Sequence, residues 1–144
     1  MGGKGKITGT YSGQVQIAEG YRNGGVFYDL PNGAETDLDG VSGCTCLTLK
    51  IQVQKCDLIW GVYEYYNPLE SEMKVDNFSG VKIAEDVWQL RDSNNDIIIT
   101  LTLSSCGKKM QFALNSGNSS SHTLQQGYFE LMSGSLKKCK SDCC

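Results

Sequence analysis

Residues 47–54 read LTLKIQVQ, and this stretch decides the fold class. Apolar and polar side chains alternate along it without exception. Leu47, Leu49, Ile51 and Val53 fall on one face, and Thr48, Lys50, Gln52 and Gln54 fall on the other. Successive side chains of a β-strand project to opposite faces, so the pattern predicts a strand with one face buried and one face in water.

Three further segments share this two-residue period: residues 14–17 (QVQI), 97–103 (IIITLTL) and 110–114 (MQFAL). No segment sustains helical spacing over about 11 residues, so little helix is expected. The inward positions of the alternating segments predict a common core. That core comprises Val15, Ile17, Leu47, Leu49, Ile51, Val53, Ile97, Ile99, Leu101, Leu103, Met110, Phe112 and Leu114.

Turn-forming residues separate the alternating segments. Residues 30–35 (LPNGAE) predict one turn, and residues 92–95 (DSNN) predict a hairpin between the segments that flank them. About eight or nine short strands at this spacing predict a single all-β domain. We expect an antiparallel β-sandwich or barrel, jelly-roll or lipocalin-like in general shape, over residues 1–136, followed by a Lys/Cys-rich tail at 137–144.

Two phrases nearly repeat one another: residues 11–20 (YSGQVQIAEG) and residues 78–86 (FSGVKIAED). Each has an aromatic residue, then Ser-Gly, then a valine and an isoleucine two positions apart. Two equivalent strands would place Val15, Ile17, Val81 and Ile83 on buried faces. Convergence on a favourable strand opening explains the repeat equally well, because the flanking sequence does not continue to match.

Composition excludes several classes of protein. The 144 residues carry a net charge of −3 and a pI near 5.1, which gives no general attraction for nucleic acid. No stretch approaches about 18 consecutive apolar residues, so no transmembrane segment is predicted. The first twenty residues lack the apolar run of a secretory signal, which favours a cytoplasmic protein. A secreted protein is the alternative, if a signal was removed before this numbering began.

The densest aromatic segment, residues 58–68 (LIWGVYEYYNP), has no polar face. Such a strand is either a central core strand or one that displays aromatic rings to a partner. The second interpretation gives the leading functional hypothesis, a non-catalytic binding module. Its ligand would be a small apolar molecule, a carbohydrate or a protein partner, bound by Trp60, Tyr63, Tyr65 and Tyr66 with Trp88 as a neighbour.

Seven cysteines suggest two alternatives. Cys139, Cys143 and Cys144 could form disulfides between chains of a homo-oligomer, whose subunits would meet through the aromatic strand or an open sheet edge. The chain could instead be a thiol-metal protein using residues 44–46 (CTC) and the tail. Neither segment has the paired spacing of a structural zinc site, so no metal and no cofactor is predicted.

Catalytic motifs are weak. His122 is the one histidine and lies in a serine-rich loop, where sequence adjacency alone provides no oriented base. Glu35, Asp37 and Asp39 resemble the start of a calcium loop, but the position of its final glutamate is Cys46. The chain is therefore not expected to be an enzyme.

Overall fold

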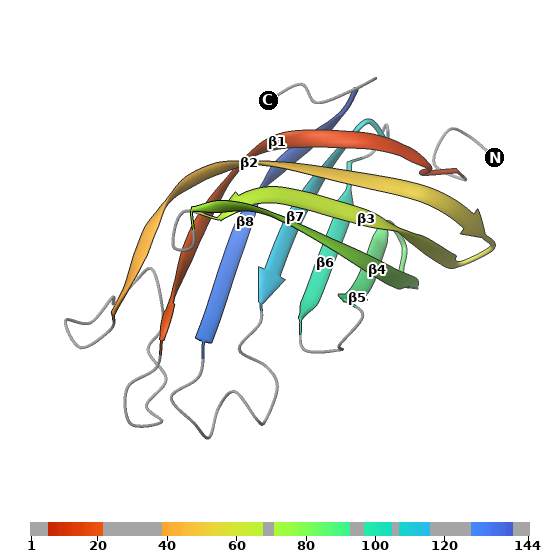
Figure 1. Ribbon diagram of the computed structural model, residues 1–144. Helices are drawn as coiled ribbons and strands as arrows, with labels where there is room; N and C mark the ends of the chain where they lie inside the picture. The colour runs from red at the N-terminus through yellow and green to blue at the C-terminus, as the bar shows by residue number, and fades with distance from the viewer. Residues whose placement is uncertain are drawn as a thin grey trace.

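The computed structural model describes residues 6–21, 39–67, 71–92, 97–104, 107–115 and 128–139. These residues form eight strands that close into one antiparallel barrel, each strand pairing with its neighbours in chain order (Figure 1). The strands are β1 (Gly9–Tyr21), β2 (Asp39–Lys55), β3 (Leu58–Asn67), β4 (Glu72–Ala84), β5 (Val87–Asp92), β6 (Ile98–Leu103), β7 (Lys109–Asn115) and β8 (Tyr128–Cys139). The predicted all-β antiparallel fold of about eight or nine strands is confirmed, and of the two predicted architectures, sandwich and barrel, the structure has the barrel.

The barrel interior contains the predicted core. Eleven of the thirteen predicted core residues are buried there, and Ile97 packs against them while half-buried. The interior also holds buried side chains that the alternating segments did not predict. These are Ile7, Tyr11, Ile59, Tyr63, Tyr65, Phe78, Trp88, Leu90, Met132 and Leu136.

Val53 is the one predicted core residue that lies outside, with 47% of its surface exposed. The cause is a β-bulge in β2: Ile51 pairs with Gly61, but Val53 pairs with the next residue of β3, Trp60. Gln52 is the extra residue. An extra residue in one strand moves each later side chain of that strand to the opposite face of the sheet. Val53 therefore points outward, although apolar and polar residues alternate in the sequence without a break.

The repeated phrase does not produce two equivalent strands. Val15 and Ile17 on β1 are 1% and 2% exposed, whereas Val81 and Ile83 on β4 are 41% and 53% exposed. The second phrase lacks the residue that stands between Gly13 and Val15 in the first. Because one residue changes the face, the deletion turns the second valine and isoleucine outward, and their predicted burial is wrong.

Gly61 on β3 lets the neighbouring strands β2 and β4 pack closely against it. A Cβ atom at this position would collide with the Lys50 carbonyl oxygen and would lie 2.9 Å from Cζ of Phe78. The missing side chain leaves room for the Phe78 ring on the neighbouring strand. Gly61 therefore lets β2, β3 and β4 share one packed interior.

The two ends of the barrel differ, and each is named after a residue. At the Ile7 end, next to the turn between β2 and β3, the buried Ile7 donates its N–H to Oε1 of Gln54 at 2.8 Å. Its carbonyl accepts the Tyr11 hydroxyl at 3.0 Å. The Asp92 end is the opposite one, where β3 and β5 end and β4 and β6 begin.

Several smaller predictions have separate outcomes. The pairing of β5 with β6 confirms the hairpin predicted around residues 92–95, although residues 93–96 lie outside the described residues, as does the turn at 30–35. The predicted domain boundary at residue 136 falls within β8, which continues to Cys139. Within the described ranges, no helix has the length and apolarity needed to cross a membrane.

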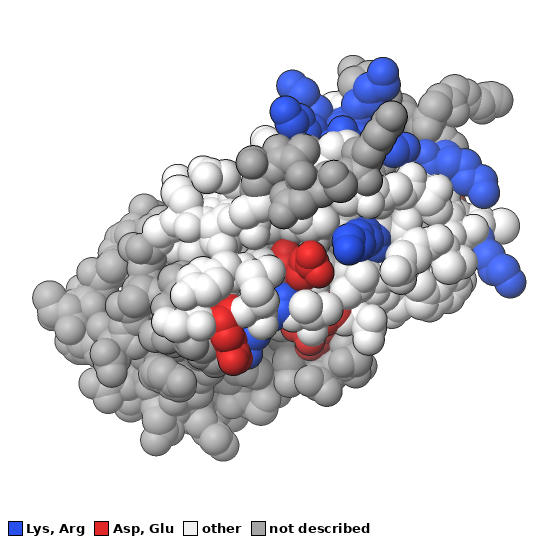
Figure 2. Space-filling model, turned by 45° about the horizontal axis from the view of Figure 1, so that its top comes forward, with Lys and Arg blue, Asp and Glu red and all other residues white. Residues whose placement is uncertain are grey.

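Charge is distributed unevenly over the described surface. Figure 2 shows lysine and arginine side chains gathered toward one end of the visible face, with carboxylates nearer its middle. Strands that end or begin at the Ile7 end contribute many of the lysines. These are Lys55 at the end of β2, Lys109 at the start of β7, and Lys137 and Lys138 near the end of β8.

The two phrases provide a matched test of the barrel's inward and outward assignment. Ile17→Ala should lower the free energy of unfolding by about 2–5 kcal/mol, because it opens a cavity in the core. Ile83→Ala should change it by less than about 0.5 kcal/mol, because that side chain is largely in water. Chemical denaturation of both variants measures the difference, and equal losses would contradict the assignment of β4.

Candidate functional site

The aromatic strand β3 divides its side chains between the two sides of the barrel wall. Tyr63 and Tyr65 point into the interior and are buried, whereas Trp60 and Tyr66 point outward and are exposed. Trp88 on β5 is buried inside the barrel. The five predicted ligand-binding residues therefore do not form one surface, and their role in binding stays a prediction.

The inner tyrosines belong to an aromatic cluster. The rings of Tyr63 and Tyr65 are stacked, with centroids 6.2 Å apart and an angle of 4° between their planes. The Phe112 ring of β7 lies 6.5 Å from that of Tyr63, at 55°. β7 is not a neighbour of β3 in the sheet, so this contact spans the interior of the barrel.

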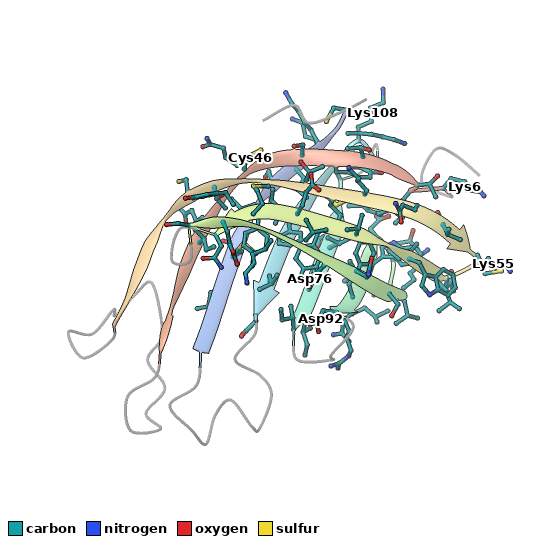
Figure 3. The ribbon with its side chains drawn as sticks, in the orientation of Figure 1. Lys6, Cys46, Lys55, Asp76, Asp92 and Lys108 are labelled. Carbon is teal, nitrogen blue, oxygen red and sulfur yellow. The ribbon has the colours of Figure 1, made fainter. Side chains whose placement is uncertain are left out.

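Charged residues line the inner face of β4 directly opposite the tyrosines. The register pairs Tyr65 with Lys74 and Tyr63 with Asp76, and it pairs Phe78 with Asp92 of β5. Figure 3 shows Asp76 and Asp92 on adjoining strands toward the Asp92 end. We call Tyr63, Tyr65, Lys74, Asp76 and Asp92 the inner polar cluster.

Burial and like charge act together on Asp76. Burial raises the pKa of its carboxyl group, and the neighbouring Asp92 carboxylate raises it further. Lys74 and a hydrogen bond from the Tyr63 hydroxyl, 3.5 Å from Oδ2 of Asp76, partly offset this rise. The ionised form of Asp76 is therefore less stable here than in water, and a nearby cation would stabilise it.

The partners of Asp76 are themselves engaged. The buried Asp92 accepts the Ile97 N–H on Oδ1 at 3.1 Å, which ties it to the start of β6. Lys74 lies 3.6 Å from Glu72 at the Asp92 end, where both side chains keep contact with solvent. Asp76, half-buried between them, therefore lies where the solvated end of the barrel meets its aromatic interior.

The outer wall carries a second distinctive feature, which we call the outer apolar surface. It consists of large apolar side chains that remain exposed, all on the adjacent strands β2, β3 and β4. They are Val53, Leu58, Trp60, Tyr66, Met73, Val75, Val81 and Ile83. Cross-strand pairing places Leu58 opposite Val81 and Tyr66 opposite Met73, so these side chains are neighbours in space.

The cysteines behave differently from one another. Cys46 and Cys139 are disulfide-bonded, whereas Cys44 and Cys56 carry free, exposed thiols. Cys139 is thus engaged within one chain and has no thiol to offer a second chain, while Cys143 and Cys144 lie outside the described residues. The predicted assembly through an open sheet edge is wrong, because the described strands close into a barrel.

The remaining sequence motifs supply no metal site within the part of the chain that the structure describes. Cys46 cannot act as a thiolate ligand while it is bonded to another sulfur, so the CTC segment offers one thiol rather than two. Among the described residues, no group of three or more histidine, cysteine or acidic side chains could hold a metal ion. His122, Glu35 and Asp37 lie outside those residues, and Asp39 is the first residue of β2.

Comparison with known proteins found no similarity in sequence. No protein-family model and no curated protein sequence matches the chain. A similar solved structure is that of the siderocalin Ex-FABP, described as functioning through dual ligand specificities. The match has a TM-score of 0.45 and 8% identity, and it covers 95% of this chain and 76% of that chain.

The electrostatic coupling within the inner polar cluster can be measured directly. Asp92→Asn should lower the pKa of Asp76 toward its ordinary value, because it removes a neighbouring negative charge. Carboxyl-carbon NMR titration follows this change. Glu64→Gln, on the outer side of β3, is the matched control and should leave the Asp76 titration unchanged. An unchanged titration in Asp92→Asn would show that burial alone perturbs Asp76.

The same shift predicts a pH dependence of stability. A raised pKa means that the folded state holds the Asp76 proton more tightly than the unfolded state does. The tighter proton binding adds to the free energy of unfolding at low pH, and this stabilisation is lost as the pH rises through the pKa of Asp76 in the folded state. Asp76→Asn should therefore decline in stability less than the wild type over this window, as measured by denaturation at a series of pH values. A parallel decline would contradict the assignment.

Proposed function

We propose that this protein is a non-catalytic binding protein that takes a small apolar ligand bearing a cationic group at the Asp92 end of its barrel. One observation carries the proposal: the half-buried Asp76, with a raised pKa, stands beside Asp92 and directly opposite the inner tyrosines. Two carboxylates in a largely apolar interior are costly unless a positive charge accompanies them. Lys74 supplies part of that charge and is shared with Glu72.

The chemistry of the cluster favours an amine over other head groups. Ionised Asp76 would pair with an ammonium group, and tyrosine rings attract cations through their faces. Next to these groups the side chains that face the interior, among them Phe112 and Phe78, are apolar and would suit an apolar tail. A carboxylate ligand would instead meet two negative charges. The neutral glycan and protein partners that the aromatic strand suggested therefore rank below a small cationic molecule.

The disulfide-bonded cysteines favour an oxidising compartment as the place where the protein works. Disulfide bonds persist in oxidising surroundings and are rare in the reducing cytosol. Cys46 and Cys139 are both bonded, so we propose that the protein works outside the cytosol, in place of the cytoplasmic location favoured by the sequence.

A second candidate function is self-association through the outer apolar surface. Exposed apolar side chains mark interaction sites, and Trp60 and Tyr66 are residue types that anchor interfaces. The outer apolar surface has two parts, one around Leu58 and Val81 and one around Tyr66 and Met73, which flank the uncharged Asn77 and Ser79. Glu64 lies opposite Val75 on the same face. A two-fold symmetric dimer would bury both apolar parts.

Ligand binding is tested with decylamine, decanol and decanoate, which share one chain and differ in the head group. In a Trp60→Phe background Trp88 is the only tryptophan, and its fluorescence reports events inside the barrel. Decylamine should bind about tenfold more tightly than decanoate, and Asp76→Asn should remove most of this preference, because one ion pair is lost. Binding of the amine should weaken as falling pH protonates Asp76.

Tyr66→Phe is the matched control for this experiment, since its ring lies on the outer wall, and it should leave binding unchanged. Tyr63→Phe removes the hydroxyl next to Asp76 and should weaken amine binding. Tighter binding of decanoate than of decylamine would overturn the proposal. Equal affinities for the amine in the wild type and Asp76→Asn would overturn it as well.

Self-association is tested separately by light scattering over about a hundredfold range of protein concentration. A dimer should form in the wild type and weaken in Trp60→Ser combined with Leu58→Ser. Ala113→Ser, at an exposed outer position of β7, is the control and should behave like the wild type. A wild type that remains monomeric throughout would exclude this second function.

A further inference from the structure

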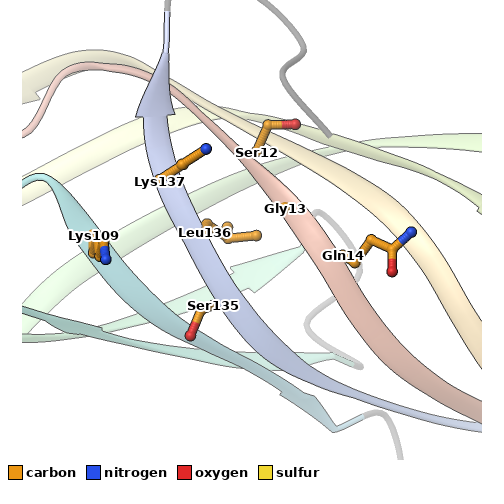
Figure 4. A pocket seen from close by; sticks show the side chains of 7 residues that line it. All are labelled: Ser12, Gly13, Gln14, Lys109, Ser135, Leu136 and Lys137. Atoms are coloured by element: carbon orange, nitrogen blue, oxygen red, sulfur yellow. The ribbon is translucent and has the colours of Figure 1, made fainter.

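We propose a separate anion-binding site on the outer wall of the barrel, where β1, β8 and β7 meet, which takes a phosphate or sulfate group. The site is a cavity of about 340 Å³ lined by Ser12, Gly13, Gln14, Lys109, Ser135, Leu136 and Lys137 (Figure 4). It lies on the opposite side of the wall from the inner polar cluster, so it does not depend on the proposed function.

The cavity coincides with an interruption in sheet pairing. β1 and β8 pair from Tyr21↔Tyr128 to Val15↔Gly134, and pairing resumes at Ser12↔Lys137. Between these positions Gly13, Gln14, Ser135 and Leu136 line the cavity, and each pairs with the strand on its other side. The register of β1 and β8 continues through them, and their backbones approach closely, since a Cβ atom on Gly13 would collide with the Ser135 carbonyl oxygen. The cavity therefore lies over the seam that closes the barrel.

The charges around the cavity are of one sign. Lys109 and Lys137 are directly opposite one another on β7 and β8, an arrangement that destabilises a sheet when the two charges are alike. Within the described part of the chain neither lysine forms an ion pair, and no carboxylate lines the cavity. A bound anion would relieve this repulsion. The arrangement is notable in a chain whose net charge is −3.

The remaining lining groups suit an oxyanion. Figure 4 shows Lys137 extending from β8 toward Ser12 on β1, with Lys109 on the far side of β8 and Gln14 farther along β1. The Lys137 and Lys109 ammonium groups can donate hydrogen bonds to phosphate or sulfate oxygens, whereas Figure 4 shows the Gln14 side chain directed away from both lysines. Ser135 already donates to Gln111 at 2.6 Å, which holds the floor of the cavity in place. Its lysines favour a tetrahedral oxyanion over a neutral ligand.

The test uses the full chain and inorganic phosphate or sulfate, with ionic strength held constant by chloride. Backbone amide NMR should show saturable shifts at residues that line the cavity. Lys109→Gln or Lys137→Gln should weaken binding about tenfold, because each removes a charge-assisted hydrogen bond. The control Lys82→Gln, an exposed lysine on β4, should leave the affinity unchanged. A loss of phosphate affinity in Lys82→Gln as large as in the cavity variants would overturn the proposed site. Chemical shifts that do not saturate with phosphate concentration would overturn it as well.

A second measurement keeps the proposal testable if a variant is unstable. Phosphate should raise the melting temperature of the wild type and of Lys82→Gln, but not that of the double variant Lys109→Gln/Lys137→Gln. Equal stabilisation of all three proteins would contradict the proposal. Vesicles containing phosphatidic acid form a further arm of the test. Binding to them that depends on Lys109 and Lys137 identifies a lipid headgroup as the source, and binding of free phosphate alone identifies a soluble ligand.

Discussion

The pairing of β1 with β8 is the constraint on which the rest of the structure depends. It closes the sheet, so each described strand has a hydrogen-bonded neighbour on both sides and no edge remains open to other chains. The seam requires close approach: a Cβ atom on Gly13 would collide with the Ser135 carbonyl oxygen. Once the sheet is closed, every position faces either a dry interior or the outer surface, and a shift of one residue exchanges the two.

This constraint explains which predictions from sequence succeeded. Two-residue periodicity reports local strand geometry, and it correctly predicted strands and most of the core. It does not report which face turns inward when a strand gains or loses a residue. Val53 follows an unbroken pattern but lies beyond a bulge, whereas Val81 and Ile83 follow a deletion. The bulge is visible only in the register between strands, which a single sequence does not contain. The deletion can be read from the two phrases, but its effect on the inward face follows only once the strands are paired.

The sequence analysis named Tyr63 and Tyr65 of the inner polar cluster but missed its charged members, because the inward face of β4 was not predicted. Residues 73–76 (MKVD) alternate, and a reading based on hydrophobicity would place Met73 and Val75 inside. The barrel does the opposite: both are exposed, and Lys74 and Asp76 face inward. One signal could have indicated this, because the aromatic Phe78 stands two residues after Asp76 and therefore shares its face. Asp92 was interpreted as part of a turn, although it is also the last inward residue of β5.

The barrel wall separates charged side chains on its inner face from those on its outer face, a division that the net charge does not show. The inner face of β4 and β5 carries two carboxylates, Asp76 and Asp92, with one lysine, Lys74, while Lys109 and Lys137 oppose one another outside, on β7 and β8. Neither group is neutralised locally by the other, because the apolar core and the sheet stand between them. Under the two proposals, each group attracts a ligand of opposite charge on its own side, and the two sites share no residue. Substitutions that far apart in a rigid wall act independently to a good approximation. One barrel could thus hold a cation within and an anion outside without either ligand excluding the other.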